Sequence, residues 1–350
     1  MKIAKHVSKL SSYVPGEQPS STKVIKLNTN ENPYPPSPQC AKVLKTFAAG
    51  KLRLYPDPES TKLRKAIAEI CNAREECVFV GNGSDEILAL VARAFVEDNE
   101  AIGSLNPSYS LYKTIAAIRN VQWRGIATLG ESLAPKKKGE SPISLFLLTN
   151  PNAPTGEWRE LSEIAAFAKK FPGVVLVDEA YADFARGNSM EIATARGNNN
   201  VIVMRTLSKS YSLAGLRVGY CIGPEKLISA LYKIKDSYNI DAIAQAVALA
   251  AVTDQKWMKK NAQRVIATRK RFTAELVKRG WDVIPSESNF VFAKPPAGNK
   301  ADDVFKALKK DGIFVRYFNG PKTKDRLRIT IGTDSQMKKL IHATEKLILR

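Results

Sequence analysis

The sequence predicts an α/β fold, in which a mainly parallel sheet is flanked by helices and a smaller α+β domain is built from the C-terminal part plus the N-terminal arm. Three observations support this prediction. Short apolar runs alternate with helical stretches between residues 61 and 250, polar residues directly follow several of these runs, and the pattern changes after about residue 250. Such runs are typical of strands that are buried on both faces of a parallel sheet.

Three regions follow one another along the chain. Residues 1–50 are rich in Pro, Ser and Asn and are predicted to form an irregular arm. Residues 51–250 form the predicted large domain, with helices over 63–71, 85–95, 111–118 and 161–170 and strands over 78–80, 101–105, 143–148, 174–177, 201–204 and 218–222. Residues 251–350 form the predicted small α+β domain, with a long helix, then the stretches 289–293, 304–310, 313–316 and 327–331, and a closing helix from 335. A single larger domain is the alternative interpretation.

The composition excludes several classes of site. The chain has 350 residues, 44% of them hydrophobic, which is enough for two domains with a sizeable core. Its two histidines lie near opposite termini and its four cysteines form no C-x-x-C pair, so neither a metal site nor a Ser-His-Asp triad is expected. Sparse cysteines and an opening without an unbroken apolar segment predict a cytoplasmic protein. No segment reaches the roughly 18 consecutive apolar residues that span a bilayer.

The formal net charge of +20 is the unusual feature of the composition. Between Lys256 and Arg279 there are nine Lys or Arg and a single acid, Glu275, but Trp257 and Phe272 lie among them as expected for an amphipathic helix. We therefore interpret this segment as a solvated helix face rather than a polyanion site. Nucleic-acid binding is the alternative function outside the enzymes, and it predicts a steep salt dependence of binding to DNA or RNA.

Polar residues collect at five predicted strand ends. In an open parallel sheet, ligands bind beyond the carboxyl ends of the strands. The stretches are G-N-G-S-D-E from Gly81, N-P-S-Y from Asn106, T-N-P-N-A-P-T-G from Thr149, D-E-A-Y from Asp178 and R-T-L-S-K-S-Y from Arg205, with G-L-R from Gly215 beyond them. Together they suit a flat, phosphorylated, electron-withdrawing aldehyde cofactor.

The chemistry of that cofactor explains the choice of residues. A lysine at a strand end forms a Schiff base with an aldehyde when its amine pKa is lowered, which makes Lys209 the candidate nucleophile. At about 4 Å and an effective dielectric near 20, Asp178 would attract a protonated ring nitrogen by roughly 4 kcal/mol, which is about three pKa units. The turn amides with Thr206, Ser208 and Arg217 would hold a phosphate dianion.

The chain resembles the pyridoxal-phosphate-dependent aminotransferases of fold type I, and most closely their histidinol-phosphate aminotransferase branch. The resemblance covers nearly the whole chain. Its motifs are L-S-S-Y-V-P-G from Leu10, L-N-T-N-E-N-P from Leu27, Y-P-D-P-E from Tyr55, G-N-G-S-D-E from Gly81, P-N-A-P-T-G from Pro151, D-E-A-Y from Asp178, R-T-L-S-K from Arg205, A-G-L-R-V-G from Ala214 and L-R-I-T-I-G-T from Leu327.

The resemblance implies pyridoxal 5'-phosphate as the cofactor and a homodimer with its sites at the subunit interface. It implies that Lys209 binds the cofactor and then carries a proton, that Asp178 pairs with the ring nitrogen and that Tyr181 pairs with the phenolic oxygen. The other implied cofactor-binding residues are Ser84, Asp85, Tyr109, Thr206, Ser208 and Arg217, with Tyr55 reaching the phosphate from the partner subunit. The implied substrate-binding residues are Tyr13, Arg316 and Arg328.

One position departs from the superfamily pattern. Members usually have Asn immediately before P-T-G, bonded to the phenolic oxygen of the cofactor, and this chain has Ala153 there. Either Asn152 takes over the cofactor contact with a shifted loop, or Tyr181 acts alone.

The implied reaction is the transamination that interconverts histidinol phosphate plus 2-oxoglutarate with imidazole-acetol phosphate plus glutamate, in histidine biosynthesis. Its partners are then small phosphorylated amine or amino-acid substrates, with no nucleic acid and no membrane. Within the same fold, an aromatic amino acid aminotransferase and a threonine-phosphate decarboxylase are the alternatives. The stretch S-L-A-G-L-R after Lys209 resembles the aminotransferase more than the decarboxylase.

Overall fold

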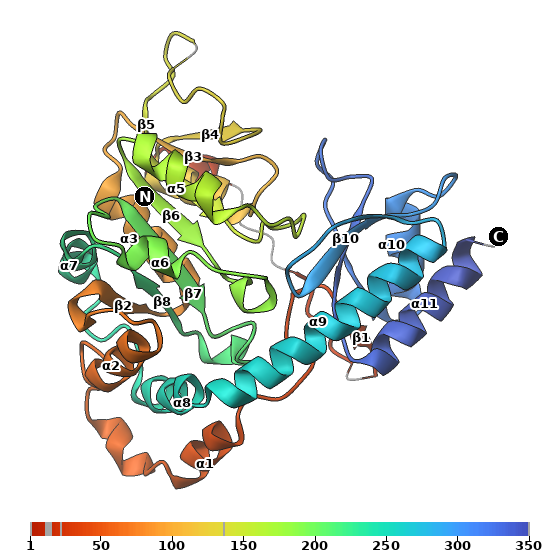
Figure 1. Ribbon diagram of the computed structural model, residues 1–350, viewed down its shortest axis with the longest axis horizontal. Helices are drawn as coiled ribbons and strands as arrows, with labels where there is room; N and C mark the ends of the chain where they lie inside the picture. The colour runs from red at the N-terminus through yellow and green to blue at the C-terminus, as the bar shows by residue number, and fades with distance from the viewer. Residues whose placement is uncertain (1, 11–15, 22, 136, 349–350) are drawn as a thin grey trace.

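A seven-stranded mixed sheet with the order β2-β8-β7-β6-β5-β3-β4 forms the centre of the larger half of the molecule (Figure 1). The computed structural model describes residues 2–10, 16–21, 23–135 and 137–348. Neighbouring strands from β4 through β7 run parallel, whereas β8 is antiparallel to both β7 and β2. The strands are β2 (Val78–Gly81), β3 (Ala101–Leu105), β4 (Gln122–Ile126), β5 (Ile143–Thr149), β6 (Val174–Asp178), β7 (Val201–Thr206) and β8 (Gly219–Ile222).

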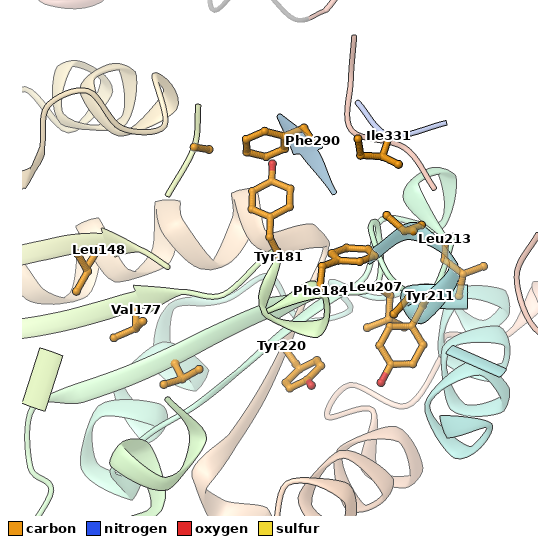
Figure 2. Packing of buried hydrophobic residues seen from close by; sticks show 14 of the residues in the cluster. Leu148, Val177, Tyr181, Phe184, Leu207, Tyr211, Leu213, Tyr220, Phe290 and Ile331 are labelled. Atoms are coloured by element: carbon orange, nitrogen blue, oxygen red, sulfur yellow. The ribbon is translucent and has the colours of Figure 1, made fainter. Parts of the chain in front are cut away.

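Side chains on the sheet alternate between two apolar layers, as the two-residue period of a strand requires. In β5, Phe146 and Leu148 belong to one layer while Leu145 and Leu147 belong to the other, and all of them are fully buried. Figure 2 shows part of the first layer, in which Leu148 and Val177 lie side by side on neighbouring strands. Both faces of the sheet are therefore covered, which explains why its strands appear in the sequence as near-continuous apolar runs.

Helices supply the apolar layer on each face. The first layer takes side chains from α2 (Thr61–Ile70), α5 (Leu161–Lys170), α6 (Met190–Thr194) and α8 (Ala242–Thr253). The second layer takes them from α3 (Gly83–Phe95), α4 (Leu111–Arg119) and α7 (Glu225–Ile234). The short 3-10 helices are η1 (Val7–Lys9), η2 (Ala49–Arg53), η3 (Glu75–Cys77), η4 (Ala182–Phe184) and η5 (Ala214–Leu216).

A four-stranded antiparallel sheet forms the centre of the smaller half. Its order is β12-β13-β10-β9, and α9 runs toward it from the end of α8 (Figure 1). The elements are α9 (Gln255–Lys278), β9 (Asp282–Ile284), β10 (Phe290–Lys294), α10 (Ala301–Lys310), β11 (Ile313–Phe314), β12 (Arg316–Tyr317), β13 (Leu327–Thr330) and α11 (Asp334–Ile348). The mainly parallel sheet between helices, together with this smaller sheet, confirms the predicted fold class.

The N-terminal region contains more regular structure than its composition predicts. β1 (Ile25–Lys26) pairs in parallel with β11, so this region returns to the smaller half. Residues 38–46 form α1 (Pro38–Thr46), which packs against α8. The Ser37 hydroxyl accepts a hydrogen bond from the Gln39 N–H at 3.1 Å, and Pro38 occupies the first helical position. The content of Pro, Ser and Asn predicts an irregular arm here, but composition does not show that Pro38 stands at a position where proline favours a helix start.

No helix in the described part of the chain is both long enough and apolar enough to cross a membrane.

Buried charges join the segment after β6 to β7. Arg205 in β7 lies 2.9 Å from a carboxylate oxygen of Glu179, whose side chain is fully buried, and 3.1 Å from one of Asp183. Asp183 also accepts a hydrogen bond from the hydroxyl of Ser210, the neighbour of Lys209. Burial raises the pKa of Glu179, and the Arg205 charge opposes that rise. The ion pairs therefore hold the turn that carries Lys209 against the loop after β6.

We expect Arg205→Met to lower the free energy of unfolding by about 3–5 kcal/mol at neutral pH, because it leaves Glu179 as a buried carboxylate without its cation. Burial raises the folded-state pKa of Glu179 above its unfolded value, so the loss should be small below that unfolded value and should grow as pH rises through the folded-state pKa. Urea unfolding of variant and wild type across this pH range measures the difference.

Arg159→Met is the matched control. Arg159 pairs with Glu163 near the surface at 3.0 Å, and removing this pair should cost no more than about 1 kcal/mol with little pH trend. A loss for Arg205→Met that stayed constant across the pH range would contradict the prediction.

Candidate active site

A cavity of about 780 Å³ lies at the carboxyl edge of the seven-stranded sheet. The carboxyl ends of β2, β3, β5, β6 and β7 reach this edge together because these strands point the same way. Residues 28–30 and the smaller half complete the wall. The predicted site residues that line the cavity are Ser84, Asp85, Tyr109, Asp178, Tyr181, Thr206, Ser208, Lys209, Arg217, Arg316 and Arg328.

Strand direction explains how Arg217 reaches this edge. Because β8 runs opposite to β2 and β7, its first residue rather than its last lies at the cavity, and Gly219 pairs with Gly81 at the end of β2. Arg217 precedes β8 and so meets the N-terminus of α3. Its Nη2 lies 3.1 Å from Asp85 Oδ2, and its Nη1 lies 3.5 Å from Ser208 Oγ.

The groups around Arg217 suit an anion. The hydroxyls of Thr206 and Ser208 are 3.0 Å apart, and α3 points its N-terminus at the same place. Gly83 opens this helix with a φ of +77°, and a Cβ there would lie 2.6 Å from Arg217 Nη2. Only glycine therefore allows the guanidinium to lie directly over the helix N-terminus. A guanidinium, two hydroxyls and free backbone amides are a donor set that fits a phosphate.

Lys209 follows β7 in the same turn as Ser208. Its Nζ donates a hydrogen bond to the backbone carbonyl of Thr29 at 3.2 Å. Burial, together with the positive charges of Arg328 and Arg217, lowers the pKa of Lys209 to about 8, while the negative charge of Glu31 opposes this fall. With a pKa of about 8, roughly a tenth of the amine is uncharged at pH 7, so it is available as a nucleophile and base.

Asp178 is the last residue of β6 and is buried. Its Oδ2 accepts a hydrogen bond from the Tyr112 hydroxyl at 2.7 Å, and its Oδ1 accepts one from the Ala180 N–H at 3.1 Å. The Tyr112 hydroxyl is also 2.6 Å from Thr149 Oγ1. Burial raises the pKa of Asp178 to about 6, and the bond from Tyr112 opposes this rise. Asp178 is therefore mostly ionised at neutral pH and is held in a fixed orientation.

Tyr181 lies three residues beyond Asp178, and its ring packs edge-on against Phe290 of β10 with centroids 5.1 Å apart (Figure 2). Its hydroxyl oxygen is 3.0 Å from the amide nitrogen of Asn30. Tyr109 lines the cavity from the segment just before α4, and its ring packs edge-on against that of Tyr112 with centroids 5.6 Å apart. Tyr109 and Tyr181 therefore line the same cavity as Lys209 and Asp178.

Arg316 and Arg328 form the wall on the side of the smaller half. They are directly opposite each other in the pairing of β12 with β13. Each guanidinium carbon lies 5.3 Å from the centre of the Phe318 ring, and Arg328 Nη2 donates to the Asn28 carbonyl at 2.8 Å. Two neighbouring guanidinium groups suit the phosphate or carboxylate of a substrate.

These groups together fit a phosphorylated pyridine aldehyde. The cavity presents an amine of lowered pKa, a buried carboxylate, a phenol and a separate phosphate-binding end. The hydroxyl of Thr29, on the same wall, is buried and has no hydrogen-bond partner among the described residues. Within the described part of the chain, the Thr29 hydroxyl is thus a buried polar group without a partner, in the residue whose carbonyl accepts from Lys209.

Two of the predicted site residues that the structure describes, Asn152 and Tyr55, do not line this cavity. Asn152 turns its amide nitrogen toward the carbonyl of Pro107 at 3.2 Å and toward Thr155 Oγ1 at 2.9 Å, so the structure gives no support for its predicted cofactor contact. Tyr55 is 80% exposed and stacks on Tyr238 with centroids 4.4 Å apart. Tyr13 lies outside the described residues.

Tyr112 and Asn30 are site residues that the sequence reasoning missed. Tyr112 lies in a predicted helix, three residues after Tyr109 and so on the same helical face, but the helical pattern indicates no role for it. Asn30 belongs to the motif L-N-T-N-E-N-P, which by itself indicates no role for this residue. Neither the helical spacing of Tyr112 nor the motif around Asn30 distinguishes a core residue from a site residue. The role of each side chain depends on a partner that is distant in the sequence.

Comparisons with known proteins agree with this geometry. The chain is 43% identical to histidinol-phosphate aminotransferase 1 of Bradyrhizobium diazoefficiens, over 98% of each chain, and 43% identical to the histidinol-phosphate aminotransferase of Geobacter sp. (strain M21), over 99% of this chain and 98% of the relative. The crystal structure of the histidinol-phosphate aminotransferase from Sinorhizobium meliloti, in complex with pyridoxal-5'-phosphate, is similar with a TM-score of 0.89 and 26% identity, over 99% of this chain and 97% of that one. The model of the family "Aminotransferase class I and II" matches residues 22–343, and the chain belongs to this family.

Proposed function

We propose that this aminotransferase interconverts histidinol phosphate plus 2-oxoglutarate with imidazole-acetol phosphate plus glutamate, as a step of histidine biosynthesis. The proposal rests on the observation that Lys209 and Asp178 line one cavity together with three cations. Arg217 lies beside the N-terminus of α3, and Arg316 with Arg328 lies on the wall formed by the smaller half. The names of relatives at 43% identity support the choice of substrate.

Pyridoxal 5'-phosphate, when bound, supplies the electron sink for the bond changes at the α-carbon of the substrate. Arg217, Thr206, Ser208 and the amides of Ser84 and Asp85 would hold its phosphate.

Each remaining side chain then has one task. Asp178 would keep the ring nitrogen protonated through its negative charge, which its neighbours hold in place. Tyr181 would donate to the phenolic oxygen, and Tyr109 would pack on the ring. Lys209 Nζ takes a proton from the α-carbon of the substrate, and its pKa of about 8 places this base near the working pH.

Arg316 and Arg328 would serve both half-reactions. Histidinol phosphate carries its phosphate on the carbon next to the one that bears the amine, which is where glutamate carries its α-carboxylate. Both groups are anions, so one pair of guanidinium groups binds either of them. This explains how a site for a phosphorylated amine also accepts an amino acid.

We also propose a homodimer in which Tyr55 of each subunit reaches the phosphate site of the other. Tyr55 is 80% exposed on its own chain, and Leu52 and Leu54 beside it are each 56% exposed. Neighbouring exposed apolar side chains mark a surface that binds another protein. Tyr238, on which Tyr55 stacks, is also exposed and continues this surface.

The division into three parts is likewise a proposal. We propose an arm over residues 1–50, a cofactor-binding domain over 51–250 and a small domain over 251–350. The start of α9 at Gln255 and its course toward the antiparallel sheet support the second boundary (Figure 1). The cytoplasmic location stays a prediction from the sequence.

Borohydride reduction of the cofactor-loaded protein should attach the cofactor covalently to Lys209, as peptide mass spectrometry would detect. Lys209→Ala should lose this attachment and about 10²- to 10⁴-fold of the turnover rate, because the base at the α-carbon is removed. In the cofactor-free protein, the rate of attachment should rise with pH up to about 8, where Lys209 loses its charge.

The control is Lys226→Ala, which replaces an exposed lysine on α7 and should change none of these measurements. Covalent attachment at another lysine, or wild-type turnover by Lys209→Ala, would refute the role of Lys209.

A panel of substrates tests the reaction itself. We expect imidazole-acetol phosphate to be the preferred amino acceptor from glutamate, ahead of aromatic keto acids. Arg316→Ala and Arg328→Ala should each lower kcat/KM for it by about 10- to 100-fold, since each loses a charge-assisted hydrogen bond. Release of carbon dioxide from O-phosphothreonine would favour the decarboxylase instead, and binding of DNA or RNA at low salt without turnover would favour the nucleic-acid alternative.

Tyr55→Phe tests the shared site. Losing a hydrogen bond to a charged phosphate should weaken cofactor binding by about tenfold, as measured by equilibrium dialysis, while light scattering should still report a dimer. Tyr238→Phe keeps the stacked surface and should bind the cofactor like the wild type. A monomeric protein that nevertheless bound the cofactor tightly would contradict both the dimer and the role of Tyr55.

A further inference from the structure

Three consecutive residues of the N-terminal region contact three functional side chains of the cavity. The carbonyl of Asn28 accepts a hydrogen bond from Arg328 at 2.8 Å, and the carbonyl of Thr29 accepts one from Lys209 at 3.2 Å. The side chain of Asn30 donates to Tyr181 at 3.0 Å. The first two contacts use backbone atoms, so Asn30 is the position at which the identity of the side chain matters.

Asn30 is itself held firmly. It is 1% exposed, and its φ is +58°, a left-handed conformation that Asn and Gly adopt more readily than other residues. Its N–H donates to Thr330 Oγ1 at 3.0 Å, and its carbonyl accepts from Asn289 Nδ2 at 2.9 Å. Residues of the smaller half thus fix the backbone of Asn30 beside Tyr181.

The same contacts decide which way the amide of Asn30 points. Thr330 Oγ1 accepts from the Asn30 N–H and lies 3.0 Å from Asn30 Oδ1, so its single proton goes to that oxygen. The other end of the amide, the nitrogen, therefore faces Tyr181. Because the Tyr181 oxygen accepts this bond, the tyrosine proton is directed away from Asn30.

We propose that Asn30 is a positioning residue for the transamination, which orients the Tyr181 hydroxyl so that it donates to the phenolic oxygen of the cofactor. The inference rests on the proposed function. Asn30 also supplies, from another segment of the chain, a side-chain amide beside Tyr181. Ala153 offers only a methyl group to the cavity wall, and the amide of Asn152 is engaged by Pro107 and Thr155.

The link has a second consequence, because Thr330 follows Arg328 on β13 by two residues. A substrate anion bound by Arg328 therefore contacts the same strand, β13, whose Thr330 side chain orients Asn30. The substrate-binding wall and the hydroxyl that faces the phenolic oxygen are therefore joined through one hydrogen-bonded chain, from Thr330 through Asn30 to Tyr181.

Asn30→Gly is the variant that tests the proposal, since glycine keeps the positive φ and the backbone hydrogen bonds but removes the amide. The readout is the pH midpoint at which the visible absorption band of the bound cofactor changes. A donor to the phenolic oxygen withdraws negative charge that would otherwise hold the proton on the neighbouring lysine nitrogen. Losing the oriented donor should therefore raise this midpoint by about half a pH unit or more.

A double-mutant comparison separates orientation of Tyr181 from general damage to the site. Tyr181→Phe should raise the midpoint by itself, and adding Asn30→Gly to it should then change nothing further, because the amide acts through the hydroxyl. Thr330→Val, which removes the bond that fixes the amide, should shift the midpoint in the same direction by a smaller amount.

Asn120→Gly is the matched control, because Asn120 also has a positive φ, of 62°, but is exposed at the end of α4. It should leave the midpoint at the wild-type value. An unchanged midpoint in Asn30→Gly, or an equal shift with and without the Tyr181 hydroxyl, would overturn the inference. A wild-type protein that shows no visible cofactor band would instead refute the proposed function, so the two failures are distinguishable.

Discussion

The direction of the strands in the central sheet is the constraint on which the site depends. Six of the seven strands end at one edge, and the exception, β8, begins there. Both arrangements bring polar residues to the same cavity, because a residue that follows a parallel strand and a residue that precedes an antiparallel one lie at the same edge. Lys209, Asp178 and Arg217 meet for this reason, although they come from three different strands.

Charge and burial then give the cavity its chemistry. Cations lie on two parts of the cavity wall, at Arg217 beside α3 and at the pair formed by Arg316 and Arg328, so anionic groups are favoured at both places. Between them, burial lowers the pKa of Lys209 to about 8 and raises that of Asp178 to about 6. The base is thus partly uncharged near neutral pH while the carboxylate stays mostly ionised, which is the combination that transamination requires.

Much of the fold follows from patterns that are local in the sequence. The strands β3, β5, β6 and β7 can be predicted from the sequence as apolar runs. Strands that are covered on both faces have apolar residues at nearly every position instead of alternating apolar and polar ones. β4 was missed because it lies at the sheet edge, where its side chains are mostly exposed or half-buried and its apolar signal is weak. α1 was missed because the position of a proline relative to the helix start decides whether it ends or begins a helix.

The sequence by itself identifies the reactive side chains, because the motifs R-T-L-S-K and D-E-A-Y place Lys209 and Asp178 at the ends of predicted strands. The packing of the strands then decides which of these side chains become neighbours. Tyr112 touches Asp178 across 66 residues and Asn30 touches Tyr181 across 151, so no local pattern predicts either contact. Such contacts depend on how the strands, helices and N-terminal region assemble, and only the folded chain brings those atoms within hydrogen-bonding distance.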